Sequence, residues 1–139
     1  MRTYNYTFWL LRSLRLACLS IKKNIIPVGC IANFDSIELA SSHNMIDVHA
    51  EVVASTKASY ILNTRNLVNI LLFITLEPCF VCVTHLMILC LKIIFFGIYT
   101  SINKKGFYLK CRFVSFNFFS TLLTCKIHKL LLLFFVKRR

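Results

Sequence analysis

Acidic residues are scarce in this chain. Its 139 residues include five Asp and Glu against 17 Lys and Arg, which gives a formal net charge of +12. The last acid is Glu77, and ten Lys and Arg follow it with no carboxylate among them. Such a surplus either keeps an apolar chain in solution or attracts a polyanion, either nucleic acid or an anionic membrane surface. Charge alone does not choose between these explanations.

Long uninterrupted apolar runs are also missing, although 58% of the residues are hydrophobic and the mean hydropathy is +0.70. A membrane-spanning helix needs ~20 apolar residues with few charges. The longest runs are shorter, and Asn69 and His85 interrupt two of them; these runs are Leu67–Leu76, Phe80–Leu91 and Leu130–Val136. Runs of this length are typical of buried strands and core helices, so we expect no membrane segment.

A recognisable secretion signal and an even cysteine count are absent as well. Arg12 and Arg15 break the first apolar stretch, and seven cysteines cannot all pair in disulfides. Both observations favour a reducing, cytoplasmic location. Cys79 and Cys82 have a spacing that suits a metal. The other cysteines are predicted to be small buried apolar residues: Cys18, Cys30, Cys90, Cys111 and Cys125.

The hydrophobic periodicity alternates between helix and strand patterns. Helices are predicted at Phe8–Ile21, from His49 to about Tyr60, from a first turn containing Pro78 to about Leu91, and from about Ser120 onward. Strands are predicted at 28–34, 37–42, Leu71–Leu76 and Ile93–Ile98. Without repeats, linkers or low-complexity segments, this order predicts one α/β domain over residues 1–139, with helices on both faces of the sheet.

Two short stretches carry the candidate chemistry: "VHAEVVA" at 48–54 and "TLEPCFVC" at 75–82. His49, Cys79 and Cys82 form a plausible three-ligand zinc set that leaves the fourth tetrahedral position to water. The two cysteines are three residues apart at a predicted helix start, where the positive helix end favours thiolate. His49 begins another predicted helix, so two helix starts can converge on one ion.

Glu51 follows His49 by two residues and is one of only five acids. Bound zinc lowers the pKa of its water toward ~7, and Glu51 is positioned to move the protons. Alone, Cys-x-x-Cys also suits a redox pair or a chance spacing, and His-x-Glu is common by chance. Together, each at a predicted helix start, they indicate a metal site. His85 lies about 240° around a helix from Cys79, so we expect it to be a core or surface histidine.

His-x-Glu followed by Pro-Cys-x-x-Cys is the signature of zinc deaminases. The chain resembles the bacterial tRNA adenosine deaminase family along most of its length, in "IPVG" at 26–29, "HAE" at 49–51, "TLEPCFVC", "FFG" at 95–97 and "FFVKRR" at 134–139. The resemblance implies the cytidine deaminase-like fold, a three-layer α/β/α sandwich around a five-stranded mixed sheet. It also implies a homodimer.

The same resemblance implies a tRNA-specific adenosine deaminase with one Zn²⁺ per chain. Such an enzyme converts the wobble adenosine (A34) of a tRNA anticodon to inosine by zinc-hydroxide attack at adenine C6, with Glu51 as proton shuttle. The expected partner is an anticodon stem-loop, that of the arginine tRNA with an adenosine wobble base. An unstacked loop base on a phosphate backbone suits a basic protein.

Carried over residue by residue, the resemblance gives each motif position a role. The zinc ligands are His49, Cys79 and Cys82, and the catalytic acid–base is Glu51. Substrate contacts fall to Asn44, the Ala50 backbone, Pro27, Val28, Glu77 and Pro78. RNA contacts fall to Lys104, Lys105, Arg138 and Arg139.

Three departures from the family pattern accompany this interpretation, and one of them is Lys126 in the last predicted helix, where an acid is common. The Asn44–His49 loop is shorter than in familiar relatives, and Thr100 stands near a position where the family usually has an aspartate.

Three alternative functions stay open. One is a zinc deaminase for a free nucleoside or base, cytidine or guanine, although "PCFVCVTH" differs from the "PCGxCRQ" of free-cytidine enzymes. Another is a catalytically inactive RNA-binding or partner subunit, which the intact ligand set disfavours. A peripheral membrane protein is the third, suggested by Leu130–Phe135 and the closing "KRR".

Overall fold

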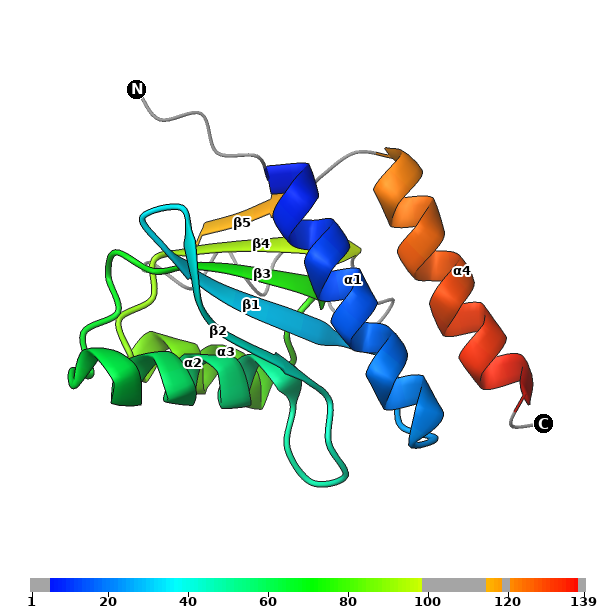
Figure 1. Cartoon of the computed structure of the whole chain (residues 1–139), viewed down its shortest axis with the longest axis horizontal. Coiled ribbons are helices and arrows are strands. Elements are labelled where there is room, and N and C mark those ends of the chain that lie inside the picture. The colour runs from blue at the N-terminus through cyan, green and yellow to red at the C-terminus, as the bar shows by residue number, and fades with distance from the viewer. Residues whose placement is uncertain (1–5, 99–114, 119–120, 138–139) are drawn as a thin grey trace.

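The computed structural model describes residues 6–98, 115–118 and 121–137. Its elements, in chain order, are α1 (Tyr6–Lys22), β1 (Gly29–Phe34), β2 (Ile37–His43), α2 (Ala50–Leu62), β3 (Leu71–Leu76), α3 (Phe80–Ile88), β4 (Ile93–Ile98), β5 (Ser115–Phe118) and α4 (Thr121–Lys137). Figure 1 shows the sheet with α2 and α3 against one face, and α1 and α4 against the other.

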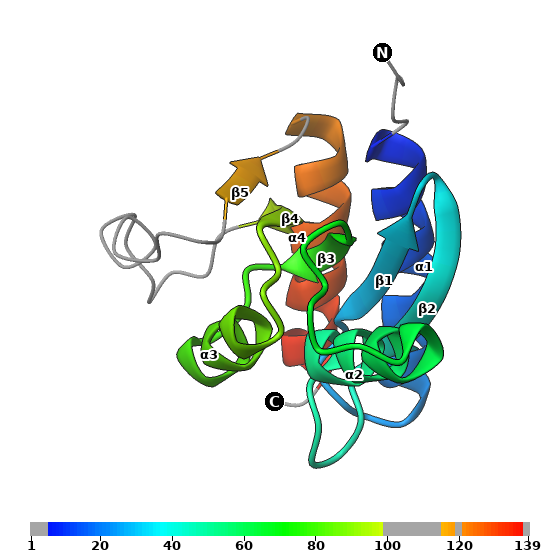
Figure 2. The same ribbon diagram turned by 90° about the vertical axis from the view of Figure 1, so that its left-hand side faces the viewer.

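The strands form one sheet in the order β2-β1-β3-β4-β5. β1 runs antiparallel to β2 and β3, whereas β3, β4 and β5 are parallel. The sheet is therefore mixed, and the view in Figure 2 shows the helices on its two sides. The predicted α/β class, with helices on both faces of a mixed sheet, is confirmed. The residue pattern did not indicate β5, because a four-residue edge strand depends on its pairing with β4 more than on its own sequence.

Both faces of the sheet are packed, which explains the continuous apolar runs in β3 and β4. Leu72 and Ile74 point into the cluster that includes the alanines of α2. Phe73, between them, points to the opposite face, where α1 and α4 pack. There its ring stacks on Phe95 with centroids 5.0 Å apart. Neither face of this part of the sheet is left to solvent.

Gly29 lets α1 lie directly on β1. A Cβ built at Gly29 would come within 1.8 Å of the Ser13 carbonyl oxygen, and within 2.8 Å of the Ala17 backbone nitrogen. Both neighbours are helix backbone, so no side-chain rotation can make room. The Gly29 amide donates to Thr75 Oγ1 at 3.2 Å, which ties the same strand residue to β3. The absence of a side chain at Gly29 therefore sets the distance between the helix and the sheet.

The predicted boundaries of α3 were wrong at both ends. The helix begins at Phe80 with Cys79 as its N-cap, so Pro78 precedes the helix instead of occupying its first turn. It ends at Ile88, short of the predicted Leu91, and Cys90 takes a left-handed conformation with φ 62°. A residue in that conformation turns the chain toward β4 and stops the helix.

The prediction for the cysteines outside the metal pair was right for Cys30, which is buried, and wrong for Cys18, Cys90 and Cys125, which are exposed. Cys18 and Cys125 lie on outward faces of α1 and α4, and Cys90 lies just past the end of α3. Cys111 lies outside the described residues. No helix in the described part of the chain is both long and apolar enough to cross a membrane.

Candidate metal centre

The predicted ligands sit at the starts of two helices. His49 is the N-cap of α2, Cys79 is the N-cap of α3, and both have extended backbone angles. Neither side chain makes a capping hydrogen bond within the described residues. Cys82 lies in the first turn of α3, on the side that faces His49. The imidazole and the two thiols are therefore free to serve a shared ligand.

The three donor atoms converge at close range. His49 Nδ1 lies 3.1 Å from Cys82 Sγ and 3.5 Å from Cys79 Sγ, and the two sulfurs are 3.3 Å apart. Tetrahedral zinc, with Zn–N of about 2.0 Å and Zn–S of about 2.3 Å, places such donors about 3.5 to 3.8 Å apart. A small outward adjustment of the side chains therefore accommodates the ion. Within the described residues, these three form the group of His, Cys, Asp and Glu able to hold a metal.

Glu51 lies beside this group with its carboxyl buried. Its side chain is 3% exposed, and Oε2 has no hydrogen-bond partner among the described residues. Burial raises the pKa of this carboxyl, while a backbone hydrogen bond, Cys82 and His49 oppose the rise. A carboxyl with a raised pKa and an unoccupied oxygen is suited to accept and return a proton near neutral pH.

The same burial acts on the neighbouring thiols. It raises the pKa of the Cys82 thiol, and the Glu51 carboxylate adds to the rise. A thiolate at Cys82 therefore needs a cation beside it, which fits a metal ligand. On β1, burial and Glu51 also raise the pKa of Cys30, which is fully buried and so stays a neutral thiol. The sequence pattern gave no sign that Cys30 lies near Glu51.

Asn44 reaches the start of α2 in spite of its short loop. The Met45 amide donates to the Val48 carbonyl at 3.0 Å, which closes the loop as a tight turn. Asn44 Oδ1 then accepts a hydrogen bond from the Ala50 amide at 2.8 Å, next to His49. The Asn44 amide donates to the Val28 carbonyl at 2.9 Å, which anchors the turn to the beginning of β1. The short loop thus places Asn44 Oδ1 at the first amide of α2.

The other predicted substrate-contact residues line the same end of the sheet. Pro27 and Val28 are buried just before β1, and Glu77 and Pro78 are buried between β3 and α3. The Glu77 amide donates to the Ile98 carbonyl at 3.0 Å, which joins this connection to the end of β4. The residues predicted to contact RNA lie outside the described part of the chain, as does Thr100. They are Lys104, Lys105, Arg138 and Arg139.

His85 does not join the metal group. Its Nε2 lies 3.4 Å from Thr56 Oγ1, so the ring sits between α3 and α2. Desolvation lowers the pKa of this half-buried imidazole. The group of converging donors in the described residues does not include His85, as the angular argument from Cys79 predicted. Sequence reasoning missed Ser20, whose hydroxyl also reaches the carbonyl of Asn44, because 24 residues separate the two in the chain.

Comparison with known proteins agrees with this geometry. Residues 5–98, more than half of the chain, match the family model of the cytidine and deoxycytidylate deaminase zinc-binding region. The tRNA-specific adenosine deaminase of Rickettsia typhi is 32% identical over 103 residues, which are 68% of this chain and 68% of that protein. The corresponding protein of Buchnera aphidicola is 26% identical over 121 residues, 83% of this chain and 80% of that protein.

Solved structures share the fold at lower identity. A chain from a study of A-to-I editing by tRNA A34 deaminases superposes with a TM-score of 0.77 at 20% identity, covering 90% of this chain and 99% of that one. A guanine deaminase from Nitrosomonas europaea superposes with a TM-score of 0.75 at 14% identity, covering 96% and 86%. Taken with the metal group and Glu51, the family match shows that this chain belongs to the zinc-binding cytidine and deoxycytidylate deaminase family, together with tRNA-specific adenosine deaminases.

Proposed function

We propose that the chain, acting as one domain over residues 1–139, deaminates the wobble adenosine (A34) of a tRNA anticodon to inosine. The observation that carries the proposal is the buried Glu51 carboxyl, with its unbonded Oε2, beside a three-ligand group that leaves one tetrahedral position open. The names of the relatives support the choice of substrate, because several are tRNA-specific adenosine deaminases.

His49, Cys79 and Cys82 are the side chains that would hold the zinc, which when bound supplies a water activated at neutral pH. Glu51 accepts a proton from the attacking water and delivers it to the adenine ring as C6 is attacked. It then moves the second proton of the added water from the oxygen on C6 to the amino group. The amino group leaves as ammonia, and C6 becomes the carbonyl carbon of inosine. One water is consumed for each ammonia released, and Glu51 returns to its starting state.

Asn44 orients the base in this proposal. Its Oδ1 already accepts from the Ala50 amide, so the side chain offers its NH₂ group to a purine acceptor. The Ala50 amide therefore contributes by fixing Asn44 rather than by bonding the base. The chain segments at Pro27–Val28 and Glu77–Pro78 border the same end of the sheet and form the walls around the base.

The anticodon stem-loop, expected to be that of the arginine tRNA, is the partner that best suits a chain with a net charge of +12. Lys104, Lys105, Arg138 and Arg139 remain our candidates for phosphate contacts. We also propose a homodimer. Exposed apolar side chains beside the metal group, at Phe80 and Val81 in the first turn of α3, supply a surface that a second copy can cover.

The proposal is tested by incubating zinc-loaded protein with an anticodon stem-loop that carries adenosine at the wobble position. Free adenosine, cytidine and guanine serve as parallel substrates. Inosine at the wobble position alone is the expected result. Deamination of a free nucleoside or base instead would assign the chain to that class of deaminase. No deamination by protein that holds one zinc per chain would indicate an inactive partner subunit.

A further inference from the structure

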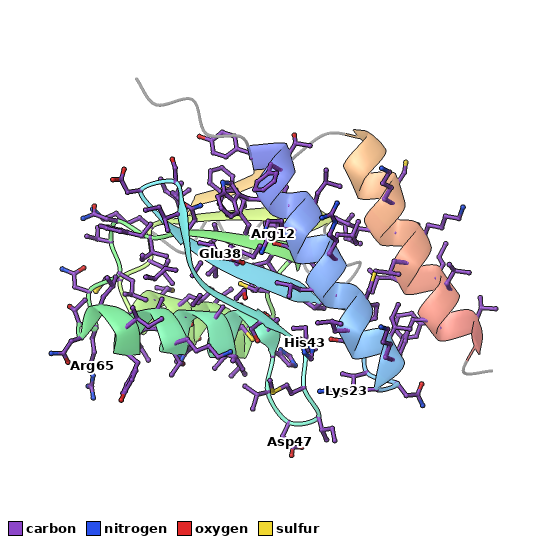
Figure 3. All side chains as sticks on the ribbon, in the orientation of Figure 1. Arg12, Lys23, Glu38, His43, Asp47 and Arg65 are labelled. Carbon is purple, nitrogen blue, oxygen red and sulfur yellow. The ribbon has the colours of Figure 1, made fainter. Side chains whose placement is uncertain are left out.

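The backbone of Asn44 is held from two further sides by residues outside the deaminase motifs. Ser20 Oγ, in the last turn of α1, donates to the Asn44 carbonyl at 3.0 Å. His43 Nδ1, at the end of β2, lies 3.1 Å from the same carbonyl oxygen and 3.3 Å from Ser20 Oγ. Figure 3 shows His43 at the foot of β2, beside the C-terminal end of α1.

The protons available to Ser20 Oγ, His43 Nδ1 and the Asn44 carbonyl oxygen determine the tautomer of His43, in which Nδ1 is protonated. The one hydroxyl proton of Ser20 is given to the Asn44 carbonyl, so it is not available to the imidazole. His43 Nδ1 contacts two oxygen acceptors, so it must carry a proton of its own. The Asn44 carbonyl thus receives hydrogen bonds from two side chains, one on α1 and one on β2.

These contacts leave one polar atom of Asn44 available. Its amide donates to Val28, its carbonyl accepts from Ser20 and lies beside His43, and its Oδ1 accepts from Ala50. Nδ2 makes no hydrogen bond to the described part of the chain. Asn44 itself is only 7% exposed. The surrounding residues therefore determine both where this side chain stands and which of its atoms faces a ligand.

The position of Ser20 follows from the packing of α1 on β1. Contact at Gly29 holds the helix backbone against the strand, and Ser20 lies one heptad beyond Ser13 on the same buried side. Ser20 is fully buried, although a hydroxyl costs free energy to bury unless it is hydrogen-bonded. Its bond to the Asn44 carbonyl provides that partner. The last turn of α1 thus holds the backbone of the loop at Asn44 through this hydrogen bond.

We propose that Ser20 and His43 are positioning residues for deamination, which hold the Asn44 backbone so that its side-chain NH₂ meets the base. This inference rests on the proposed function, because it takes Asn44 to contact the substrate. Neither Ser20 nor His43 touches the reacting atoms. Their loss acts on substrate binding through Asn44 and leaves the metal group and Glu51 in place.

Ser20→Ala tests the proposal, with Ser13→Ala as its matched control. Both serines are fully buried on α1, and Ser13 Oγ also donates to strand backbone, at 3.0 Å from the Phe73 carbonyl. We expect Ser20→Ala to raise KM for the stem-loop about fivefold or more while kcat stays within about twofold, as for the loss of one hydrogen bond. Ser13→Ala should leave KM unchanged.

Two further variants separate positioning from a general loss of structure. In an Asn44→Ala background, Ser20→Ala should raise KM no further, because its effect passes through Asn44. His43→Leu should raise KM as Ser20→Ala does, whereas His43→Asn, which keeps a donor near the Nδ1 position, should recover much of the loss. Equal KM increases in the Ser13 and Ser20 variants, or additive effects of Ser20→Ala and Asn44→Ala, would overturn the proposal.

Hydrogen exchange of the Ala50 amide provides a readout independent of activity. That amide donates to Asn44 Oδ1, so a displaced Asn44 should expose it and speed its exchange in Ser20→Ala but not in Ser13→Ala. If the wild-type protein deaminates no RNA, the proposed function fails, yet this exchange rate still decides whether Ser20 positions Asn44. Unchanged exchange in Ser20→Ala would contradict the positioning role.

Discussion

Gly29→Ala should destabilise the protein and weaken substrate binding by a single displacement. The added Cβ would lie 1.8 Å from the Ser13 carbonyl oxygen, whereas real Cβ contacts are essentially never below 3.0 Å. Helix and strand must therefore separate by about 1.2 Å, because the atoms it meets belong to backbone. The Ala17 nitrogen at 2.8 Å prevents a simple slide of the helix along its axis.

Overpacking of this kind costs about 1 to 3 kcal/mol, which in a domain of this length lowers Tm by about 3 to 5 °C per kcal/mol. A separation of about 1.2 Å would also stretch the 3.0 Å bond from Ser20 Oγ to the Asn44 carbonyl beyond hydrogen-bonding range. KM for the stem-loop should therefore rise as it does in Ser20→Ala. Urea unfolding and steady-state deamination measure the two effects.

Gly97→Ala provides the control for this prediction. Its Cβ would meet Ile127 Cδ1 at 2.0 Å, the far end of a side chain that can rotate, although the Thr75 carbonyl at 2.8 Å still requires a small shift. We expect a smaller loss of stability and an unchanged KM, because α4 rather than α1 is displaced. The reasoning is refuted if Gly29→Ala unfolds at the wild-type urea concentration, or if its KM equals that of Gly97→Ala.

Two further predictions concern the metal group and Glu51, and a third concerns His85. Glu51→Gln should keep its zinc but lower kcat by about 10²- to 10⁴-fold, since the shuttle is lost while the ligands remain; inosine formation and metal analysis check this, and retained turnover would contradict it. Cys82→Ala should lose zinc, and a full metal complement after dialysis would disprove its role as a ligand. Because burial lowers the pKa of His85 from 6.5, the fold favours its neutral form. Below pH 6.5 the unfolded chain binds a proton at this imidazole more readily than the folded chain does, so the free energy of unfolding falls as the pH drops. The stabilisation from neutral His85 is therefore present above pH 6.5 and lost below it. In His85→Gln, the free energy of unfolding measured from urea curves should change less over this pH range than in wild type.

The metal group could be predicted because its signals are local. His49 and Glu51 are two residues apart, and Cys79 and Cys82 are three apart, each pair beginning a helix whose apolar pattern is visible. The bounds of β3 and β4 were also correct, since both are apolar runs bounded by polar residues or turns.

Features that depend on distant parts of the chain were missed. β5 forms by pairing with β4, and α3 ends early because Cys90 adopts a left-handed conformation. The contact between Ser20 and Asn44 depends on how closely α1 approaches β1, and spacing in the sequence does not reveal that approach. The predicted RNA contacts at Lys104, Lys105, Arg138 and Arg139 stay predictions, because they lie outside the described residues.

Because His49 and Cys79 are the N-caps of α2 and α3, zinc bound to them would also affect the stability of both helices. Ser, Thr, Asp and Asn normally fill such positions and bond the unpaired amides of the first turn, which stabilises a helix by about 0.5 to 2 kcal/mol. Here those positions hold His49 and Cys79, whose side chains make no such bond to the described residues. An ion held by both would join two helix starts whose own N-cap side chains make no capping hydrogen bond. Metal loss should therefore loosen α2 and α3 together, so that this enzyme's thermal stability reports its zinc content.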